Sequence, residues 1–366
     1  MTASTDFIVD RADLREGKFV TTQLPELDPG QILLRVAKFA LTANNITYGA
    51  AGDTIGYWRF FPARDGWGRI PVWGYADVIA SKNDALPVGE RVYGYLPIST
   101  HVILDPGRIT PTTFIDAAAH RAALPPVYNQ YLRVGADRAY FSGREDEIAL
   151  YRPLFSTSFL IDDFLADNDF FGARNVVLTS ASSKTALGLA QLLHVHRKGQ
   201  IKVVGLTSAG NMPFVERTGY YDRVVGYADL PSLDARTPTL YVDFYGDRDL
   251  RAKLHAHFGD HLKYACIVGA THWESLAGVS SIADRTPLPG AKPVFFFAPD
   301  RIVKRTADWG GAGVAKRIGE ALSAFAASAK PWMRVVEGRG QGAIEKAYGG
   351  FITGKTDPAE GHILSL

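Results

Sequence analysis

The feature that most restricts the fold of this chain is an alternation of short apolar runs with helical runs, which begins near residue 175. Six apolar runs are typical of buried strands, at 175–180, 201–206, 223–225, 239–244, 264–269 and 293–297. Between them, helical periodicity is found at 185–194, 211–218 and 248–258. Continuous apolar strands that alternate with helices indicate a parallel sheet covered on both faces. The segment therefore predicts an α/β, doubly wound dinucleotide-binding domain.

The residues on either side of this segment have a different character. Residues 1–110 are typical of strands joined by turns, such as the strand at 31–40 that follows Leu27-Asp28-Pro29-Gly30. A chain of 366 residues is too long for one ordinary core. We therefore expect a first domain at 1–150 that is completed by 315–366, with the doubly wound domain nested at 151–314.

Composition narrows the class of protein. Apolar residues make up 46% of the chain and charged residues 21%, as in soluble globular proteins, and no run reaches the ~18 apolar residues of a membrane span. The single cysteine, Cys266, allows neither an internal disulfide nor a multi-cysteine zinc site. The net charge of +2 gives no general attraction to nucleic acid or membrane lipid. Because the first residues lack the pattern of a secretory signal, we expect a cytoplasmic protein that acts on a small molecule.

A turn of small residues follows the first strand of the nested domain. It consists of Ser180-Ala181-Ser182-Ser183-Lys184-Thr185, and a helix follows it. Such a turn lets peptide N–H groups and the positive end of the helix face a pyrophosphate, and Lys184 adds a positive charge. The glycines of the G-x-G-x-x-G fingerprint are missing, and so is the glycine-rich run of a P-loop. The turn indicates a dinucleotide site, and an ordinary serine-capped helix is the alternative.

The end of the second strand bears on the choice between NADH and NADPH. An NAD site places an acidic residue ~20 residues beyond the turn, where it holds the ribose 2′-hydroxyl. Here Thr207 and Ser208 take that place, and Asn211 follows at the start of the next helical run. No carboxylate would repel a 2′-phosphate, and the available cations are Lys184, Lys202 and Arg217. We expect NADPH as the cofactor; the alternative is that these are simply loop residues.

Six blocks of sequence occur in a recognisable order. They are Pro29-Gly30-Gln31-Ile32-Leu33-Leu34-Arg35-Val36, the loop 41–53, the turn Val88-Gly89-Glu90-Arg91-Val92-Tyr93-Gly94, and the stretches 175–193, 202–227 and 343–366. Their order resembles that of the medium-chain dehydrogenase/reductases, and most closely a divergent bacterial group of the zinc-independent, quinone oxidoreductase-like branch. The resemblance covers almost the whole chain. It implies a GroES-like partial β-barrel domain with a nested Rossmann domain, a cleft between them for nicotinamide and substrate, and a homodimer.

The sequence differs from the zinc-bearing branch of this family. That branch needs a cysteine in the substrate-side loop and a Gly-His-Glu stretch. Here the loop 41–53 has no cysteine, and the comparable stretch is Pro71-Val72-Trp73-Gly74-Tyr75. We therefore expect no metal.

Without a metal, hydrogen-bond donors must polarise the substrate oxygen. The resemblance implies direct hydride transfer from the nicotinamide, with candidate donors in the substrate-side loop and in the apparent insertion at 128–151: Asn44, Asn45, Tyr48 and Tyr128. Candidate walls for a flat substrate are Tyr57, Trp58 and Tyr131. On the cofactor side, the residues expected near the nicotinamide are Gly269, Ala270, Thr271 and Phe297. The alternatives are that the asparagines only shape a turn and that the aromatic residues only pack.

Three functions remain open from the residues alone. The leading one is an NADPH-dependent oxidoreductase that reduces an enone, quinone, aldehyde or ketone. The second is a nicotinamide-nucleotide-binding sensor or interaction protein without reductase turnover. The third is an enzyme that has lost the cofactor and performs lyase chemistry. A histidine group at 255–261 is a weak metal candidate. A basic patch at 301–305 is typical of an ordinary surface, and the alternative is that it meets a cofactor or an anionic substrate.

Overall fold

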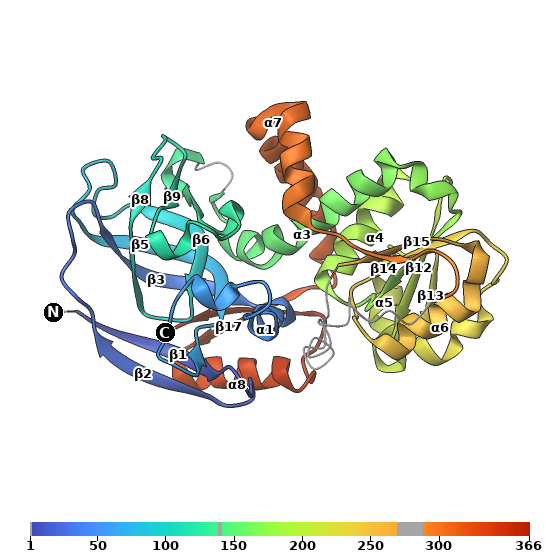
Figure 1. The fold of residues 1–366 in the computed structure, drawn as a ribbon, viewed down its shortest axis with the longest axis horizontal. Helices are drawn as coiled ribbons and strands as arrows, with labels where there is room; N and C mark the ends of the chain where they lie inside the picture. Colours follow the sequence, from blue (N-terminus) through green and yellow to red (C-terminus); the bar gives the residue numbers. More distant parts are fainter. Residues whose placement is uncertain (1, 138–140, 269–287) are drawn as a thin grey trace. The chain divides into compact units, whose positions relative to one another are not determined.

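The computed structural model describes residues 2–137, 141–268 and 288–366, and divides the chain into two compact units (Figure 1). Unit 1 comprises Met1–Leu150, Val335–Thr356 and Glu360–Leu366, and unit 2 comprises Tyr151–Arg334 and Asp357–Ala359. Residues 315–334, which we expected in the first domain, therefore lie in unit 2. The reason is helix α7 (Ala298–Ala329), whose buried Phe325 stacks on Phe155 with ring centroids 5.0 Å apart.

Unit 1 is built mainly from antiparallel strands. In the described part of the chain, its larger sheet has the order β17-β18-β3-β5-β6-β10-β9-β8, with β7 paired to β3. The strands of this sheet are β3 (Ile32–Leu41), β5 (Pro71–Ser81), β6 (Arg91–Pro97), β7 (His101–Leu104), β8 (Pro106–Gly107), β9 (Thr113–Asp116), β10 (Gln130–Arg133), β17 (Arg334–Arg339) and β18 (Glu360–Ser365). A smaller sheet has the order β2-β1-β4 and consists of β1 (Ala3–Asp10), β2 (Gly17–Gln23) and β4 (Trp67–Gly68).

Short helices connect these strands. They are α1 (Ala43–Ala50), α8 (Gln341–Ile352) and the 3-10 turns η1 (Tyr57–Arg59), η2 (Ala119–Arg121), η3 (Pro126–Tyr128) and η4 (Val134–Asp137). Helix α1 begins where it does because Thr42 and Asn45 form a capping box, which satisfies free peptide groups at the helix start. The same loop carries the candidate substrate-side residues.

Unit 2 contains the predicted parallel sheet. Its order is β13-β12-β11-β14-β15-β16, and every pairing is parallel. The strands are β11 (Asn175–Thr179), β12 (Lys202–Thr207), β13 (Arg223–Gly226), β14 (Thr239–Asp243), β15 (Leu262–Ile267) and β16 (Pro293–Phe295). In chain order of the strands this is 3-2-1-4-5-6, the doubly wound arrangement that places ligands outside the carboxyl ends of the strands, where the order reverses.

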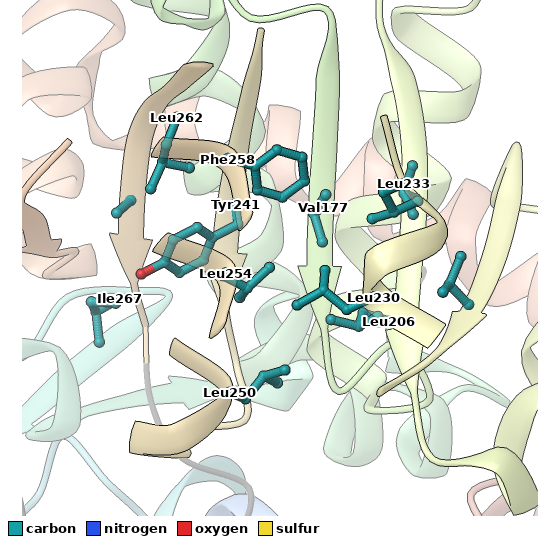
Figure 2. Packing of buried hydrophobic residues seen from close by; sticks show 13 residues of the cluster. Val177, Leu206, Leu230, Leu233, Tyr241, Leu250, Leu254, Phe258, Leu262 and Ile267 are labelled. Carbon is teal, nitrogen blue, oxygen red and sulfur yellow. The ribbon is translucent and has the colours of Figure 1, made fainter. Parts of the chain in front are cut away.

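Helices cover this sheet and close its core. They are α3 (Glu145–Asp167), which begins in unit 1, α4 (Lys184–His196), α5 (Met212–Thr218), α6 (Arg248–Phe258) and α7. The 3-10 turns are η5 (Asp169–Gly172), η6 (Ala209–Asn211), η7 (Tyr227–Ser232) and η8 (Gly259–His261). Figure 2 shows how α6 packs: Leu250, Leu254 and Phe258 recur at helical spacing and lie in one buried cluster with the strand residues Val177 and Tyr241.

Among the described residues, no helix has the length and apolarity that a membrane crossing requires.

Candidate functional site

The turn between β11 and α4 is the centre of the candidate cofactor site. Ser180 follows β11 with φ of +48°, the left-handed region that glycine ordinarily occupies. Ser183 is the N-cap of α4, and its side chain accepts a hydrogen bond of 3.3 Å from the Ala186 N–H. The serine cap that we considered as an alternative is therefore present. It does not exclude a ligand, because one cap leaves other N–H groups at the helix start unsatisfied.

The peptide nitrogens of the turn differ in their hydrogen bonding. The Ser180 N–H donates to the Tyr227 hydroxyl at 3.2 Å, and the Ala181 N–H donates to the Leu206 carbonyl at 3.2 Å. Within the described part of the chain, the nitrogens of Ser182 and Thr185 have no hydrogen-bond partner. Two donors at the start of a helix, at the carboxyl edge of a parallel sheet, suit an anionic group such as a pyrophosphate.

Small residues bring the turn close to its neighbours. A Cβ atom on Gly205 would lie 3.0 Å from the Ala181 Cβ and 2.8 Å from the Tyr221 ring. A Cβ atom on Gly188 would lie 2.8 Å from the Ser158 Oγ. These two glycines therefore allow the close strand and helix packing that the missing fingerprint glycines otherwise provide. Gly205 lies in the middle of an ordinary apolar strand, so the sequence did not indicate its role.

The end of β12 carries the residues expected near an adenosine ribose. Thr207 is buried at the end of the strand, and Ser208 is exposed immediately after it. Asn211 lies close to the turn, because its Nδ2 donates to the Ser182 Oγ at 3.1 Å.

Of the three cations considered for a 2′-phosphate, only Lys184 lies in the turn. Lys202 is the first residue of β12. At ~3.3 Å per residue it stands about 16 Å from Thr207, at the amino edge of the sheet, so its inclusion was wrong. Arg217 is exposed in the last turn of α5.

The structure describes only one of the four residues expected near the nicotinamide. Gly269, Ala270 and Thr271 lie outside the described residues. Phe297 is half-buried at the start of α7, and its ring stacks with that of Phe295 at a centroid distance of 6.5 Å.

On the substrate side, the two candidate asparagines have different roles. Asn45 accepts from the Thr42 N–H at 2.8 Å and donates from Nδ2 to the Pro71 carbonyl at 2.9 Å. It is only 3% exposed, so it fixes the start of α1, as the turn-shaping alternative predicts. Asn44 is half-buried, and its side chain hydrogen-bonds to the Tyr48 hydroxyl.

Four tyrosines from separate segments meet in unit 1, and we call them the tyrosine cluster: Tyr48, Tyr57, Tyr95 and Tyr128. The hydroxyls of Tyr57 and Tyr128 are 3.0 Å apart, and Trp73 Nε1–H donates to the Tyr48 hydroxyl at 3.3 Å. The rings of Tyr48 and Tyr57 have centroids 4.7 Å apart, and those of Tyr95 and Tyr128 lie 4.9 Å apart. Among the described residues, the buried Tyr95 hydroxyl has no hydrogen-bond partner. The structure thus joins three predicted residues to one, Tyr95, that the sequence did not indicate.

Burial sets the protonation of this cluster. It raises the pKa of Tyr48 and of Tyr57 above the ordinary value of 10.0, and the neighbouring tyrosines add to the rise. Burial likewise raises the pKa of Tyr95 and of Tyr128 well above that value. All four hydroxyls therefore keep their protons at neutral pH and can act as hydrogen-bond donors.

The other two candidate substrate residues are packed into the unit. Tyr131 is fully buried, its hydroxyl donates to the Tyr95 carbonyl at 2.6 Å, and its ring stacks on Phe114. Burial raises the pKa of Tyr131 to about 12. It supports the Tyr95 strand and presents no wall to a ligand, so the packing alternative describes it. Trp58 is 6% exposed and lies against the backbone of Gly52 and Gly68.

A buried ion pair that the sequence did not reveal supports the cluster. Arg121 Nε lies 3.0 Å from the Asp116 Oδ2, and both side chains are 2% exposed. Arg121 also donates from Nε to the Phe60 carbonyl at 3.2 Å, and its own carbonyl accepts from Asn129 Nδ2 at 3.3 Å. These contacts tie the segment that carries Tyr128 to the segment that carries Tyr57.

The other charged candidates from the sequence have structural partners. The basic patch at 301–305 is neutralised by Asp163, Asp167 and Asp308, so it is not a free anion site. His255 is buried, with its ring nitrogens 2.9 Å from the Tyr241 hydroxyl and 2.8 Å from the Pro289 carbonyl. Among the described residues, no group of three His, Cys, Asp or Glu side chains is arranged to hold a metal ion.

Comparison with known proteins identifies the fold. Residues 39–357 match the model of a family described as "Protein of unknown function (DUF2855)". The curated proteins give no match to the sequence. Among solved structures, CurA from Vibrio vulnificus is 13% identical with a TM-score of 0.58, covering 99% of this chain and 98% of that one. It has also been solved in complex with NADPH, at 14% identity and the same TM-score and coverage.

Two further structures are similar over nearly the whole chain. The yhdH oxidoreductase from Salmonella enterica in complex with NADP is 14% identical with a TM-score of 0.52, covering 99% of both chains. The quinone oxidoreductase from Coxiella burnetii is 13% identical with a TM-score of 0.54, covering 100% of both chains. The expected fold, a GroES-like partial β-barrel domain with a nested Rossmann domain, is confirmed, and the resemblance to the medium-chain dehydrogenase/reductases is confirmed as one of fold.

Proposed function

This chain belongs to the DUF2855 family, and we propose that it is an NADPH-dependent oxidoreductase. It would reduce an enone, quinone, aldehyde or ketone by direct hydride transfer without a metal. The observation that carries the proposal is the turn at 180–186, at the carboxyl edge of a doubly wound sheet. There, among the described residues, the peptide nitrogens of Ser182 and Thr185 have no partner at the start of a helix. Structures of the same fold hold NADPH in CurA and NADP in the yhdH oxidoreductase.

The residues of the turn suit such a cofactor. The nitrogens of Ser182 and Thr185 would donate to the pyrophosphate, and Lys184 would add a positive charge. At the end of β12, Thr207 and Ser208 leave no carboxylate to repel a 2′-phosphate, which favours NADPH over NADH. When bound, NADPH supplies the hydride.

The tyrosine cluster supplies the hydrogen bonds that the reaction needs. Arrival of a hydride at an enone or carbonyl carbon leaves negative charge on the oxygen, which a preorganised O–H donor stabilises. Tyr57 and Tyr128 share one hydrogen bond, so one of the two hydroxyls keeps its proton for the substrate. Tyr48 accepts from Trp73, and Asn44 orients it from the side. We assign Tyr128 as the principal donor, with Tyr57 and Tyr48 as its supports.

The proposal extends to the remaining expectations. It includes a nicotinamide contact by Phe297, a cytoplasmic location and a homodimer. Each rests on the resemblance or on composition.

The test is to mix the protein with NADPH and a panel of quinones, enones and aldehydes. Turnover is measured as the loss of NADPH absorbance. Tyr128→Phe removes only the hydroxyl and should lower kcat about a hundredfold, as loss of a general acid does. Tyr264→Phe is the matched control, because the Tyr264 ring stacks on Phe171 within unit 2, whereas the tyrosine cluster belongs to unit 1. Binding of NADPH without turnover of any substrate would replace the reductase with a nicotinamide-binding sensor.

A further inference from the structure

Unit 1 contains a pocket that the proposed reaction does not use. It has a volume of about 380 Å³, within the range of small-molecule sites. Its lining consists of Arg11, Trp67, His120 and residues between 52 and 63. All of these residues belong to unit 1, so the pocket is complete within one compact body.

An unpartnered indole nitrogen faces this pocket. Trp58 as a whole is 6% exposed, and among the described residues its Nε1–H has no hydrogen-bond acceptor. The nitrogen lies against Gly52, which lines the pocket, because a Cβ atom on that glycine would be 2.2 Å from Nε1. The nitrogen itself is not enclosed by the described part of the protein, so a ligand in the pocket can accept its hydrogen bond.

The charges around the pocket favour an anion. Arg11 and Asp53 pair with each other and largely cancel. Arg59 also lines the pocket, and in the described part of the chain its guanidinium has no carboxylate partner. No acidic residue other than Asp53 is in the lining. The pocket therefore offers an unpaired guanidinium and an indole N–H, both of which are donors.

The walls favour a flat ring. Trp58 and Trp67 both line the pocket, together with Pro62. Two cations lie near the Trp67 ring: Lys18 Nζ is 3.8 Å and the Arg64 guanidinium is 5.1 Å from the ring centroid. Aromatic walls contribute contact area to another ring, while the surrounding cations disfavour a positively charged ligand.

We propose that this pocket binds a small aromatic carboxylate. The carboxylate pairs with Arg59 and accepts the Trp58 N–H, and the ring packs between the tryptophans. A charge-assisted hydrogen bond to arginine and one from an indole N–H are the recognition elements. The inference is independent of the proposed redox function, because the pocket shares no residue with the turn at 180–186.

The test is calorimetric titration of the full chain with benzoate, in the absence of NADPH. Benzyl alcohol keeps the ring without the charge, and inorganic phosphate keeps a charge without the ring. Arg59→Gln should weaken benzoate binding about tenfold, as loss of a charge-assisted hydrogen bond does. The matched control is Arg35→Gln, because Arg35 is an exposed arginine of the same unit that lies on β3 and pairs with Asp77. It should leave binding unchanged.

A second readout locates the ligand. In a ¹⁵N-labelled sample, the Trp58 indole N–H resonance, assigned by its loss in Trp58→Phe, should shift when benzoate is added. The proposal is overturned if benzoate gives neither heat nor a shift, if Arg59→Gln binds as tightly as the natural chain, or if phosphate or benzyl alcohol binds as tightly as benzoate. Because Arg59 is exposed, its substitution tests the site even if Trp58→Phe fails to fold.

Discussion

Replacing Asp116 by asparagine is the perturbation whose effect the structure predicts most sharply. The substitution keeps the shape of the side chain and removes its charge. Asp116 is the carboxylate partner of the buried Arg121, and its other oxygen accepts the N–H groups of Asp105 and Ala118 at 3.1 Å each. Burial raises the pKa of Asp116, and Arg121 opposes that rise. The variant leaves a guanidinium that is 2% exposed without a countercharge.

The size of the effect follows from this burial. Removing one partner of a buried ion pair costs about 3–5 kcal/mol. Arg121 keeps its hydrogen bond to the Phe60 carbonyl and its place 4.5 Å from the Phe61 ring centroid. These contacts retain part of its stabilisation, so we expect the lower end, about 3 kcal/mol. For a domain of ~150–250 residues that corresponds to a fall in Tm of about 6–12 °C.

Thermal and denaturant unfolding measure this loss, and a double variant tests its cause. Asp116→Asn combined with Arg121→Met replaces the pair by an apolar contact, and should be more stable than Asp116→Asn alone, because no uncompensated charge remains. The reasoning is refuted if Asp116→Asn costs less than about 1 kcal/mol, or if the double variant is no more stable than the single one. Because Arg121 and Asn129 hold the segment of Tyr128, the single variant should also lower kcat.

Three further predictions concern unit 2. Ser180→Gly relieves a left-handed residue and should keep or raise stability by up to about 1 kcal/mol in denaturant unfolding; a loss larger than that would show that the Ser180 side chain is needed. Gly205→Ala places a Cβ 2.8 Å from the Tyr221 ring, and should cost about 1–3 kcal/mol and weaken NADPH binding in a titration; an unchanged affinity would contradict the packing argument. Burial lowers the pKa of His255 from 6.5, so the unfolded chain takes up the proton first, and the stability present above pH 6.5 is lost as the pH falls below it. His255→Gln should reduce that slope, by up to about 1.4 kcal/mol per pH unit, in unfolding curves measured across this range.

The parts of the fold that the sequence predicted are those with a local signal. The six strands of unit 2 could be predicted because apolar runs alternate with helical periodicity. The turn after β11 could be predicted from its run of small residues. The fingerprint glycines were not needed, because Ser180 adopts the left-handed conformation and Gly205 provides the close approach.

The parts that could not be predicted depend on contacts between distant segments. The Asp116–Arg121 pair is close in sequence, but its burial depends on Phe60, and the role of Asn45 is set by the Pro71 carbonyl. Tyr95 lies on an ordinary apolar strand, and only folding brings it to Tyr128. The basic patch at 301–305 was misleading for the same reason, since its carboxylate partners include residues of α3.

The error over Lys202 was of another kind. The residue begins a strand whose direction the βα alternation already indicated, so its place at the amino edge of the sheet could have been inferred from the sequence.

The most direct test of the central claim is thermal unfolding of the full chain with NADPH and, separately, with NADH. At a hundred times its dissociation constant, NADPH should add about 2.7 kcal/mol to the free energy of unfolding, and NADH at the same concentration should add less. Should neither nucleotide raise the unfolding temperature, the turn at 180–186 does not bind a dinucleotide, and the oxidoreductase assignment is wrong.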